Sequence, residues 1–137
     1  MKQYLSLIIL AISISFMACD DNFTEDCYDY EPDEAEIVIH VTINDENDSI
    51  PYILFKGRIE ERDTILVDTA TAKKWYVWVP VKEYYSVQAK YTVNGNQVIT
   101  SDGKKLRLMN DSDDSSVCWK TIGEDHHVQL IYEDEMN

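Results

Sequence analysis

The stretch Tyr84-Tyr85-Ser86-Val87-Gln88-Ala89-Lys90-Tyr91-Thr92-Val93-Asn94-Gly95 decides the fold. Five alternate positions share one predominantly apolar face: Tyr85, Val87, Ala89, Tyr91 and Val93. This period of two is typical of a β-strand with one buried face. Asn94-Gly95 follows directly and is a strong hairpin signal, because both positions of such a turn must accept positive φ. We expect a strand over 84–93 and a returning strand that sets Val98 opposite Tyr91.

A second dense stretch, Trp75-Tyr76-Val77-Trp78-Val79, comes just before it. Pro80 ends this strand, and residues 80–83 read as a four-residue loop. If 75–79 and 84–93 form a hairpin, Trp78 lies opposite Tyr85 and Tyr76 lies opposite Val87.

The remaining segments read as further short strands separated by turns. Residues 36–43 carry Ile37, Ile39, Val41 and Ile43 on one face. Other strands are expected at 51–59, 64–69, 96–100, 106–108, 117–122 and 127–132, with turns at 44–49, 60–62, Asp102-Gly103 and 110–116. No helix-period segment of useful length appears after the N-terminal leader. The sequence predicts an all-β, antiparallel β-sandwich of about seven to nine strands over residues 36–137.

Residues 69–99 resemble the small immunoglobulin-like and prealbumin-like sandwiches of bacterial surface proteins. In those sandwiches a strand, a Pro-containing turn and a Tyr-led strand recur in this order. The stretch carries no catalytic motif, so the resemblance implies a fold and no activity. The whole chain resembles small lipoproteins of Bacteroidetes-type bacteria.

The leader begins with the basic residue Lys2, followed by an apolar run over 5–17 that is too short to cross a bilayer. Phe16-Met17-Ala18-Cys19 resembles the lipobox of bacterial lipoproteins, although Phe16 replaces the usual leucine. The resemblance implies a signal peptide over 1–18, a lipidated Cys19 and anchoring in the cell envelope. Asp20-Asp21 looks like the export signal of surface lipoproteins, which implies the outer membrane and its exposed side. A plain secreted protein is the alternative.

The formal net charge of −14 is concentrated near the start of the mature chain, where residues 20–36 hold nine acidic residues and no Lys or Arg. Such a segment repels nucleic acid, so DNA or RNA partners are not expected. We interpret residues 19–35 as a solvated acidic tether. The alternative is a lure for a basic partner or for divalent cations.

Cys27 and Cys118 remain once Cys19 is lipidated, and in an oxidising compartment an even remainder favours a disulfide. Two free thiols are the alternative. A metal or redox role is not expected, since the chain has no C-x-x-C motif.

Other candidate sites fit their motifs poorly. The acidic run 111–115 lacks the EF-hand pattern, because Ser116 and Ile122 stand where glycine and glutamate are needed; a looser carboxylate site or a solvated loop remains. His126 and His127 are adjacent, so on a strand they point to opposite faces. With His40 distant in sequence, we expect no metal and no cofactor. Catalytic motifs are lacking, so we do not expect an enzyme.

The best binding candidates are the aromatic residues of the 75–85 stretch: Trp75, Tyr76, Trp78, Tyr84 and Tyr85. They either lie buried under the tether or a flanking strand, or form an exposed platform for a sugar or a protein partner. We therefore expect a lipid-anchored envelope protein with a non-catalytic binding or structural role. The alternative is a glycan-binding surface lipoprotein that uses these aromatics.

Overall fold

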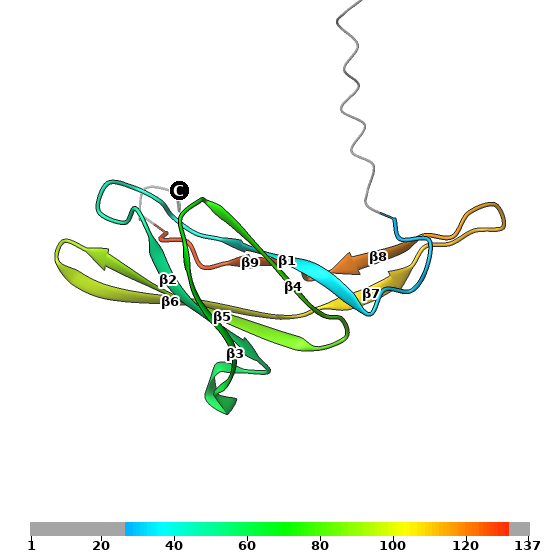
Figure 1. Cartoon of the computed structure of the whole chain (residues 1–137), viewed down its shortest axis with the longest axis horizontal. Coiled ribbons are helices and arrows are strands. Elements are labelled where there is room, and N and C mark those ends of the chain that lie inside the picture. The colour runs from blue at the N-terminus through cyan, green and yellow to red at the C-terminus, as the bar shows by residue number, and fades with distance from the viewer. Residues whose placement is uncertain (1–26, 132–137) are drawn as a thin grey trace, which may run out of the picture.

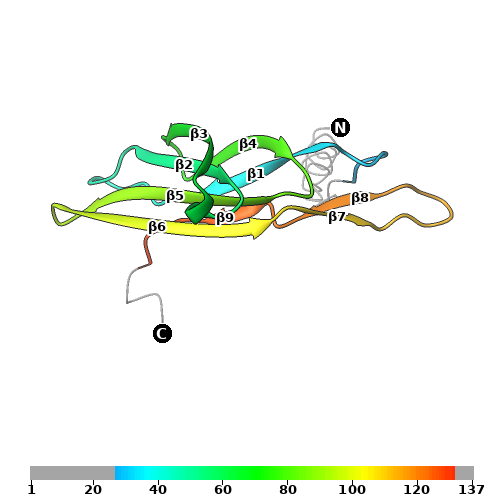
Figure 2. The same ribbon diagram turned by 90° about the horizontal axis from the view of Figure 1, so that it is seen from below.

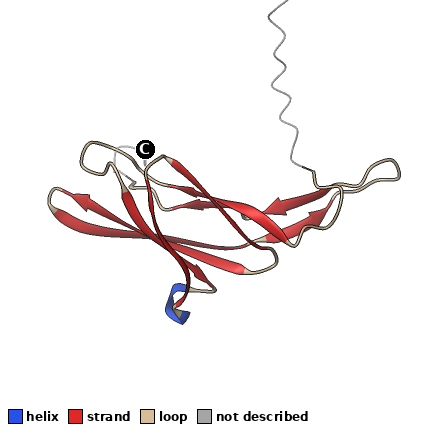
Figure 3. Cartoon of the chain, viewed as in Figure 1, coloured by secondary structure: helices blue, strands red, loops and turns tan. Residues whose placement is uncertain are grey.

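The structure is a computed structural model that describes residues 27–131, so the predicted signal peptide and Cys19 lie outside the described residues. It contains nine strands and one short 3-10 helix (Figures 1 and 3). The elements are β1 (Glu34–His40), β2 (Ile50–Lys56), η1 (Ile59–Glu61), β3 (Asp63–Ala70), β4 (Lys74–Pro80), β5 (Tyr84–Val93), β6 (Asn96–Lys105), β7 (Arg107–Asn110), β8 (Trp119–Ile122) and β9 (Asp125–His127).

Two sheets pack face to face, which confirms the predicted all-β sandwich (Figure 2). The small sheet has the order β4-β1-β9, and the large sheet has the order β3-β2-β5-β6. The pairing of β1 with β9 is parallel, which departs from the wholly antiparallel expectation. β7 and β8 form a separate two-stranded hairpin that extends from one end of the sandwich (Figure 1).

The core lies between the inward faces of β1 and β5, and both faces were predicted from their alternation. Ile37 and Ile39 on β1 are fully buried, as are Val87 and Ala89 on β5. Each large aliphatic side chain buried in this way stabilises the fold by roughly 1.5–3 kcal/mol. The apolar residues whose alternation predicts the strands β1 and β5 are therefore the same residues that pack the two sheets together.

The hairpin between β5 and β6 is confirmed. Asn94 and Gly95 both have positive φ, at 51° and 78°, which is the turn geometry that their sequence favours. Tyr91 pairs with Val98 as expected. A turn whose chemistry is local can thus fix the register of two ten-residue strands.

The predicted hairpin between residues 75–79 and 84–93 is wrong. β4 pairs with β1 in the small sheet, whereas β5 already has β2 and β6 on its two sides. The chain crosses between the layers at residues 81–83, where the Val81 N–H donates to the Asp33 carbonyl (3.0 Å) and Lys82 adopts a φ of 67°. The Tyr85 hydroxyl donates to the Pro80 carbonyl (2.7 Å) and fixes this crossing.

The predicted turn at Asp102-Gly103 is also wrong, because both residues lie inside β6. Gly103 pairs with Ser86, and a Cβ at Gly103 would lie 2.7 Å from the Tyr84 hydroxyl oxygen and 3.0 Å from Ser86 Oγ. Glycine stands here because neighbouring side chains approach the backbone, not because the chain reverses. The last strand also differs: β9 covers Asp125–His127, whereas the sequence predicted 127–132.

The disulfide between Cys27 and Cys118 is confirmed and spans a sequence separation of 91. Beside it, Tyr28 and Trp119 exchange two backbone hydrogen bonds of 2.9 and 3.0 Å. Glu31 forms an ion pair with Lys82. The described part of the predicted tether, from residue 27 onward, is therefore attached to the domain. In the chain-entropy model, closing so long a loop stabilises a fold by up to about 4.5 kcal/mol, mainly by restricting the unfolded chain.

Candidate functional site

The most distinctive surface is the outer face of the small sheet, hereafter the small-sheet face. Because β1 and β4 bury alternate residues in the core, their other side chains point outward. The register aligns these outward residues in three rows across the sheet. The rows are Glu36 with Trp78, then Val38 with Tyr76 and Asp125, then His40 with Lys74 and His127.

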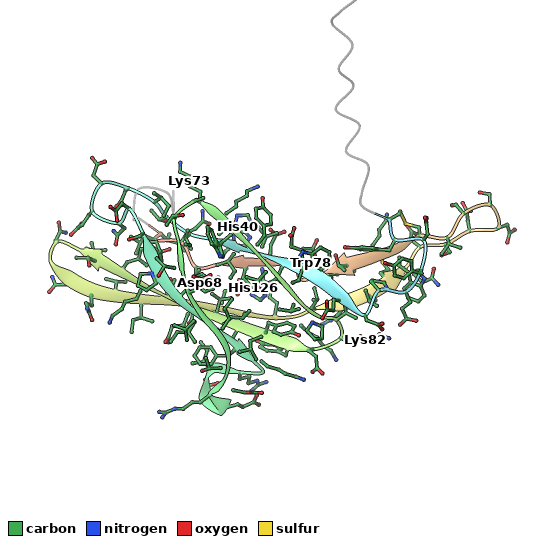
Figure 4. The ribbon with its side chains drawn as sticks, in the orientation of Figure 1. His40, Asp68, Lys73, Trp78, Lys82 and His126 are labelled. Carbon is green, nitrogen blue, oxygen red and sulfur yellow. A yellow bond between two sulfur atoms is a disulfide. The ribbon has the colours of Figure 1, made fainter. Side chains whose placement is uncertain are left out.

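Two aromatic side chains stand exposed on this face. Tyr76 is 54% exposed and Trp78 is 59% exposed, which is unusual for side chains of this size. They are two residues apart on β4, so their rings lie on the same side of the strand. Figure 4 shows Trp78 on β4 and His40 farther along the same sheet. The sequence reasoning named both aromatics as binding candidates.

A hollow of about 830 Å³ lies against these rings. One side is made by the outward residues of β1 and β4, and the other by the N-terminal segment, β8 and the start of β9. The lining residues are Cys27, Tyr28, Glu36, Val38, Lys74, Tyr76, Trp78, Lys120, Thr121, Glu124 and Asp125. The disulfide helps to build this hollow, because it holds Cys27 and Tyr28 beside β8.

The hollow mixes apolar rings with charged groups of both signs. Lys74 lies on β4 with the two aromatic rings, and Glu36 lies opposite Trp78 on the neighbouring strand β1. Within residues 27–131, the Glu124 carboxylate oxygen Oε2 is buried without a hydrogen-bond partner. A buried acceptor of this kind costs free energy until a donor reaches it. The surface therefore suits a ligand that has both apolar faces and hydrogen-bond donors.

The five aromatics of the 75–85 stretch do not form one platform, so that interpretation is corrected. Trp75 is half-buried against the core. Tyr85 is only 1% exposed, and its burial, aided by Glu83 and Glu34, raises the pKa of its phenol to about 12. Tyr84 belongs to the large sheet and packs beside Gly103. The platform reading assumed a hairpin, and assignment of β4 and β5 to different sheets separates the aromatics.

The three histidines lie close together on β1 and β9, and the sequence predicted only part of this arrangement. His126 is buried and His127 is exposed, so the prediction of opposite faces is correct. The parallel pairing of β1 with β9 sets His40 opposite His127, which the distance in sequence had concealed. Their rings stack with centroids 4.5 Å apart and planes 20° apart. His40 Nε2 also lies 2.5 Å from Asp125 Oδ1.

His126, labelled in Figure 4, stands between Asp125 and His127 on β9, points to the opposite face and is fully buried. Within residues 27–131 neither of its ring nitrogens has a hydrogen-bond partner. Burial lowers the pKa of His126 to about 4; Asp102 and Asp125 oppose this shift, and Lys104 and His127 add to it. His126 is therefore neutral at physiological pH and acts as a core residue.

The acidic loop at 111–115 is organised by its own hydrogen bonds. Asp113 Oδ1 accepts from the backbone and hydroxyl groups of Ser115 and Ser116, at 2.7–3.2 Å. These bonds lower the pKa of Asp113 to about 2. Since the aspartate closes a local turn, the structure favours a solvated loop over a cation site.

Comparison with family models, curated proteins and solved structures finds no match for this chain. Across residues 27–131, no helix has the length and apolar character needed to cross a membrane.

Proposed function

We propose that this chain is a non-catalytic binding protein, held at the cell envelope by a lipid on Cys19, and that the small-sheet face is its binding surface. The observation that carries the proposal is the exposure of Tyr76 and Trp78 side by side over a hollow of about 830 Å³. Concave surfaces with a few placed polar groups are where proteins bind ligands. Adjacent exposed aromatics are otherwise costly to leave in water.

The absence of catalysis in this proposal rests on how the reactive groups are used. Cys27 and Cys118 are bonded to each other, which leaves neither thiol as a nucleophile. His126 points away from the hollow into the core. Ser86 lies in the large sheet and donates its hydroxyl proton to the Gly57 carbonyl (2.8 Å). These groups are engaged in the fold, and none lines the hollow as a free nucleophile paired with a base.

A saccharide is the ligand class that this face fits best. Sugar rings present apolar C–H faces that stack on aromatic rings, together with hydroxyl groups that bond to carboxylates. Trp78 lies opposite Glu36 across the β1–β4 pair, so a stacking ring and an acceptor are neighbours. A protein partner is the alternative occupant, since aromatic residues are also enriched in protein interfaces.

A glycan array tests the saccharide assignment. The full-length protein in detergent is applied, together with Trp78→Ala, Tyr76→Ala and the control Tyr30→Ala. Tyr30 is 70% exposed but does not line the hollow. We expect binding to be lost with the first two variants and kept with the control, with unchanged far-UV circular dichroism and thermal unfolding midpoint throughout. A blank array for the wild type would overturn the saccharide and leave a protein as the occupant.

The anchor has a separate test. Cys19→Ser should prevent incorporation of labelled fatty acid and release the protein from the membrane fraction. Retention of the variant in the membrane fraction, with the label still attached, would contradict lipidation at Cys19. The two experiments are independent, because Cys19→Ser leaves every residue that defines the small-sheet face unchanged.

A further inference from the structure

The cluster of His40, Asp125 and His127 at the end of the small-sheet face offers three metal ligands. One ligand atom from each residue lies within 4.8 Å of the other two. The positions follow from the sheet: His40 and His127 are paired across β1 and β9, and Asp125 precedes His127 by two residues on the same face. The backbone of two neighbouring strands therefore fixes the three side chains together.

The local contacts favour a cation at this point. Two imidazole rings stack while His127 is exposed, and His40 keeps only 15% of its side chain exposed. Asp125 supplies a negative charge 2.5 Å from His40 Nε2, and half of its side chain reaches solvent. His127 Nδ1 lies 3.4 Å from Gln129 Oε1, which is the outer contact that orients a ligating imidazole.

We infer that His40, Asp125 and His127 form a binding site for a divalent transition-metal ion of the zinc type. Two imidazoles and one carboxylate are ligands that Zn²⁺ accepts, and three protein ligands leave a fourth position open. Hard cations such as Mg²⁺ prefer sites made of oxygen ligands, so this set discriminates against them. The site goes beyond the proposed function, since stacking on Tyr76 and Trp78 needs no metal.

Binding requires one small rearrangement. Ligands of a tetrahedral ion bound at about 2.0–2.2 Å lie farther apart than the present contact between His40 and Asp125. The exposed Asp125 carboxylate can rotate to admit the ion between the two side chains. Lys74 lies opposite His40 on β4 and opposes the ion by its charge. Its replacement should therefore strengthen binding.

Isothermal titration calorimetry with Zn²⁺ tests the site on the untagged full-length protein in detergent, without reductant or chelator. We expect one saturable equivalent that an equal concentration of Mg²⁺ does not displace. His127→Gln and Asp125→Asn should weaken binding by more than about a hundredfold, because loss of an outer contact alone costs about 10- to 100-fold. Lys74→Gln should strengthen it. The matched control Asp45→Asn removes an exposed carboxylate that is not part of the cluster and should change nothing.

Nuclear magnetic resonance of the histidine rings supplies a second readout. Zn²⁺ should shift the ring signals of His40 and His127 and leave the inward-facing His126 nearly unmoved. Because the His127 side chain lies outside the core, His127→Gln keeps the test valid even if changes at His40 unfold the protein. The site is overturned if no saturable binding occurs, if His127→Gln binds like the wild type, or if Asp45→Asn weakens binding as much as Asp125→Asn.

Discussion

Strands β5 and β9 lie in opposite layers of the same sandwich, yet they form for different reasons. β5 has ten residues, pairs on both sides and carries its own alternating pattern of buried residues. β9 has three residues and pairs with β1 alone. Its place is fixed by groups on β6: Asp102 Oδ2 accepts from the His127 N–H (2.8 Å), and Lys104 Nζ donates to the Asp125 carbonyl (2.6 Å).

The difference separates residues that stabilise the whole fold from residues that shape the surface of the small sheet. The core strand β5 is encoded by its own residues and presents little chemistry at the surface. The short strand β9 depends on the rest of the fold, and it brings Asp125 and His127 next to His40. Changes in β5 should therefore cost the fold the most stability, whereas changes around β9 should cost less and should also alter the small-sheet face.

The largest effect is expected at Tyr91, a β5 residue that reaches β9's side of the molecule. It is 1% exposed, accepts from the Thr42 N–H (3.1 Å) and donates to the Val128 carbonyl (2.7 Å). Tyr91→Ala should lower the free energy of unfolding by about 4 kcal/mol, because it leaves a cavity and breaks both hydrogen bonds. Tyr91→Phe should cost about 1–2 kcal/mol. Urea unfolding measures both free energies. If Tyr91→Ala and Tyr91→Phe lose equal stability, packing of the Tyr91 ring does not contribute to the fold.

A smaller effect is expected from His126 in β9 as the pH falls. The folded pKa of about 4 lies below the ordinary 6.5, so between these values the unfolded chain binds a proton that the folded chain does not. The contribution of neutral His126 to the free energy of unfolding is therefore fully present above pH 6.5. It is lost as the pH falls toward 4, by about 3 kcal/mol in all.

Unfolding in EDTA across this pH range measures the slope, and His126→Leu supplies the comparison. The variant should lose most of the pH dependence between 6.5 and 4. A variant with the same slope as the wild type would show that the acid sensitivity originates elsewhere.

Asp102 comes next, because it holds β9 from β6. Burial raises the pKa of Asp102, but the hydrogen bond from His127 and the charge of Lys104 outweigh it, so the net pKa is lowered. Asp102→Ala should cost about 2 kcal/mol and speed hydrogen exchange of the β9 amides. Asp114→Ala, on an exposed loop, is the control. If the β9 amides exchange at the same rate in both variants, Asp102 does not hold the strand.

The smallest effect concerns the turn that follows β5. Gly95 has a φ of 78°, and a Cβ there would meet no atom within 4 Å, so the cost of a side chain is purely conformational. Gly95→Ala should destabilise by about 1 kcal/mol, and Gly95→Asn by less, since Asn tolerates positive φ. Thermal unfolding compares the two. If Gly95→Ala and Gly95→Asn lower stability equally, the positive φ of Gly95 is not the cause of the loss.

The sequence predicted those parts of the fold whose signals are local. The faces of β1 and β5, the Asn94-Gly95 turn and the disulfide follow from alternation, turn chemistry and cysteine number. The β4–β5 hairpin and the Asp102-Gly103 turn failed because sheet membership and close backbone approach outweighed local preference.

The candidate site was predicted only in part. Tyr76 and Trp78 were named from composition, and their exposure follows from the pairing of β4 with β1. The juxtaposition of His40 with His127 depends on a parallel pairing between the first and last strands, for which the sequence offers no local signal. A search for histidines on the same face of strands at opposite ends of the chain would have raised it as a candidate.

The disulfide also determines how the protein bears mechanical load. Residues 28–117 lie inside the covalent loop closed by Cys27 and Cys118, so tension between the two ends of the described chain bypasses them. Force enters at Cys27, passes through the sulfur atoms and continues along β8 and β9. Among residues 27–131, the pull would therefore extend the segment after Cys118 and separate β8 and β9 from their partner strands, while the covalent loop stays closed until the disulfide is reduced.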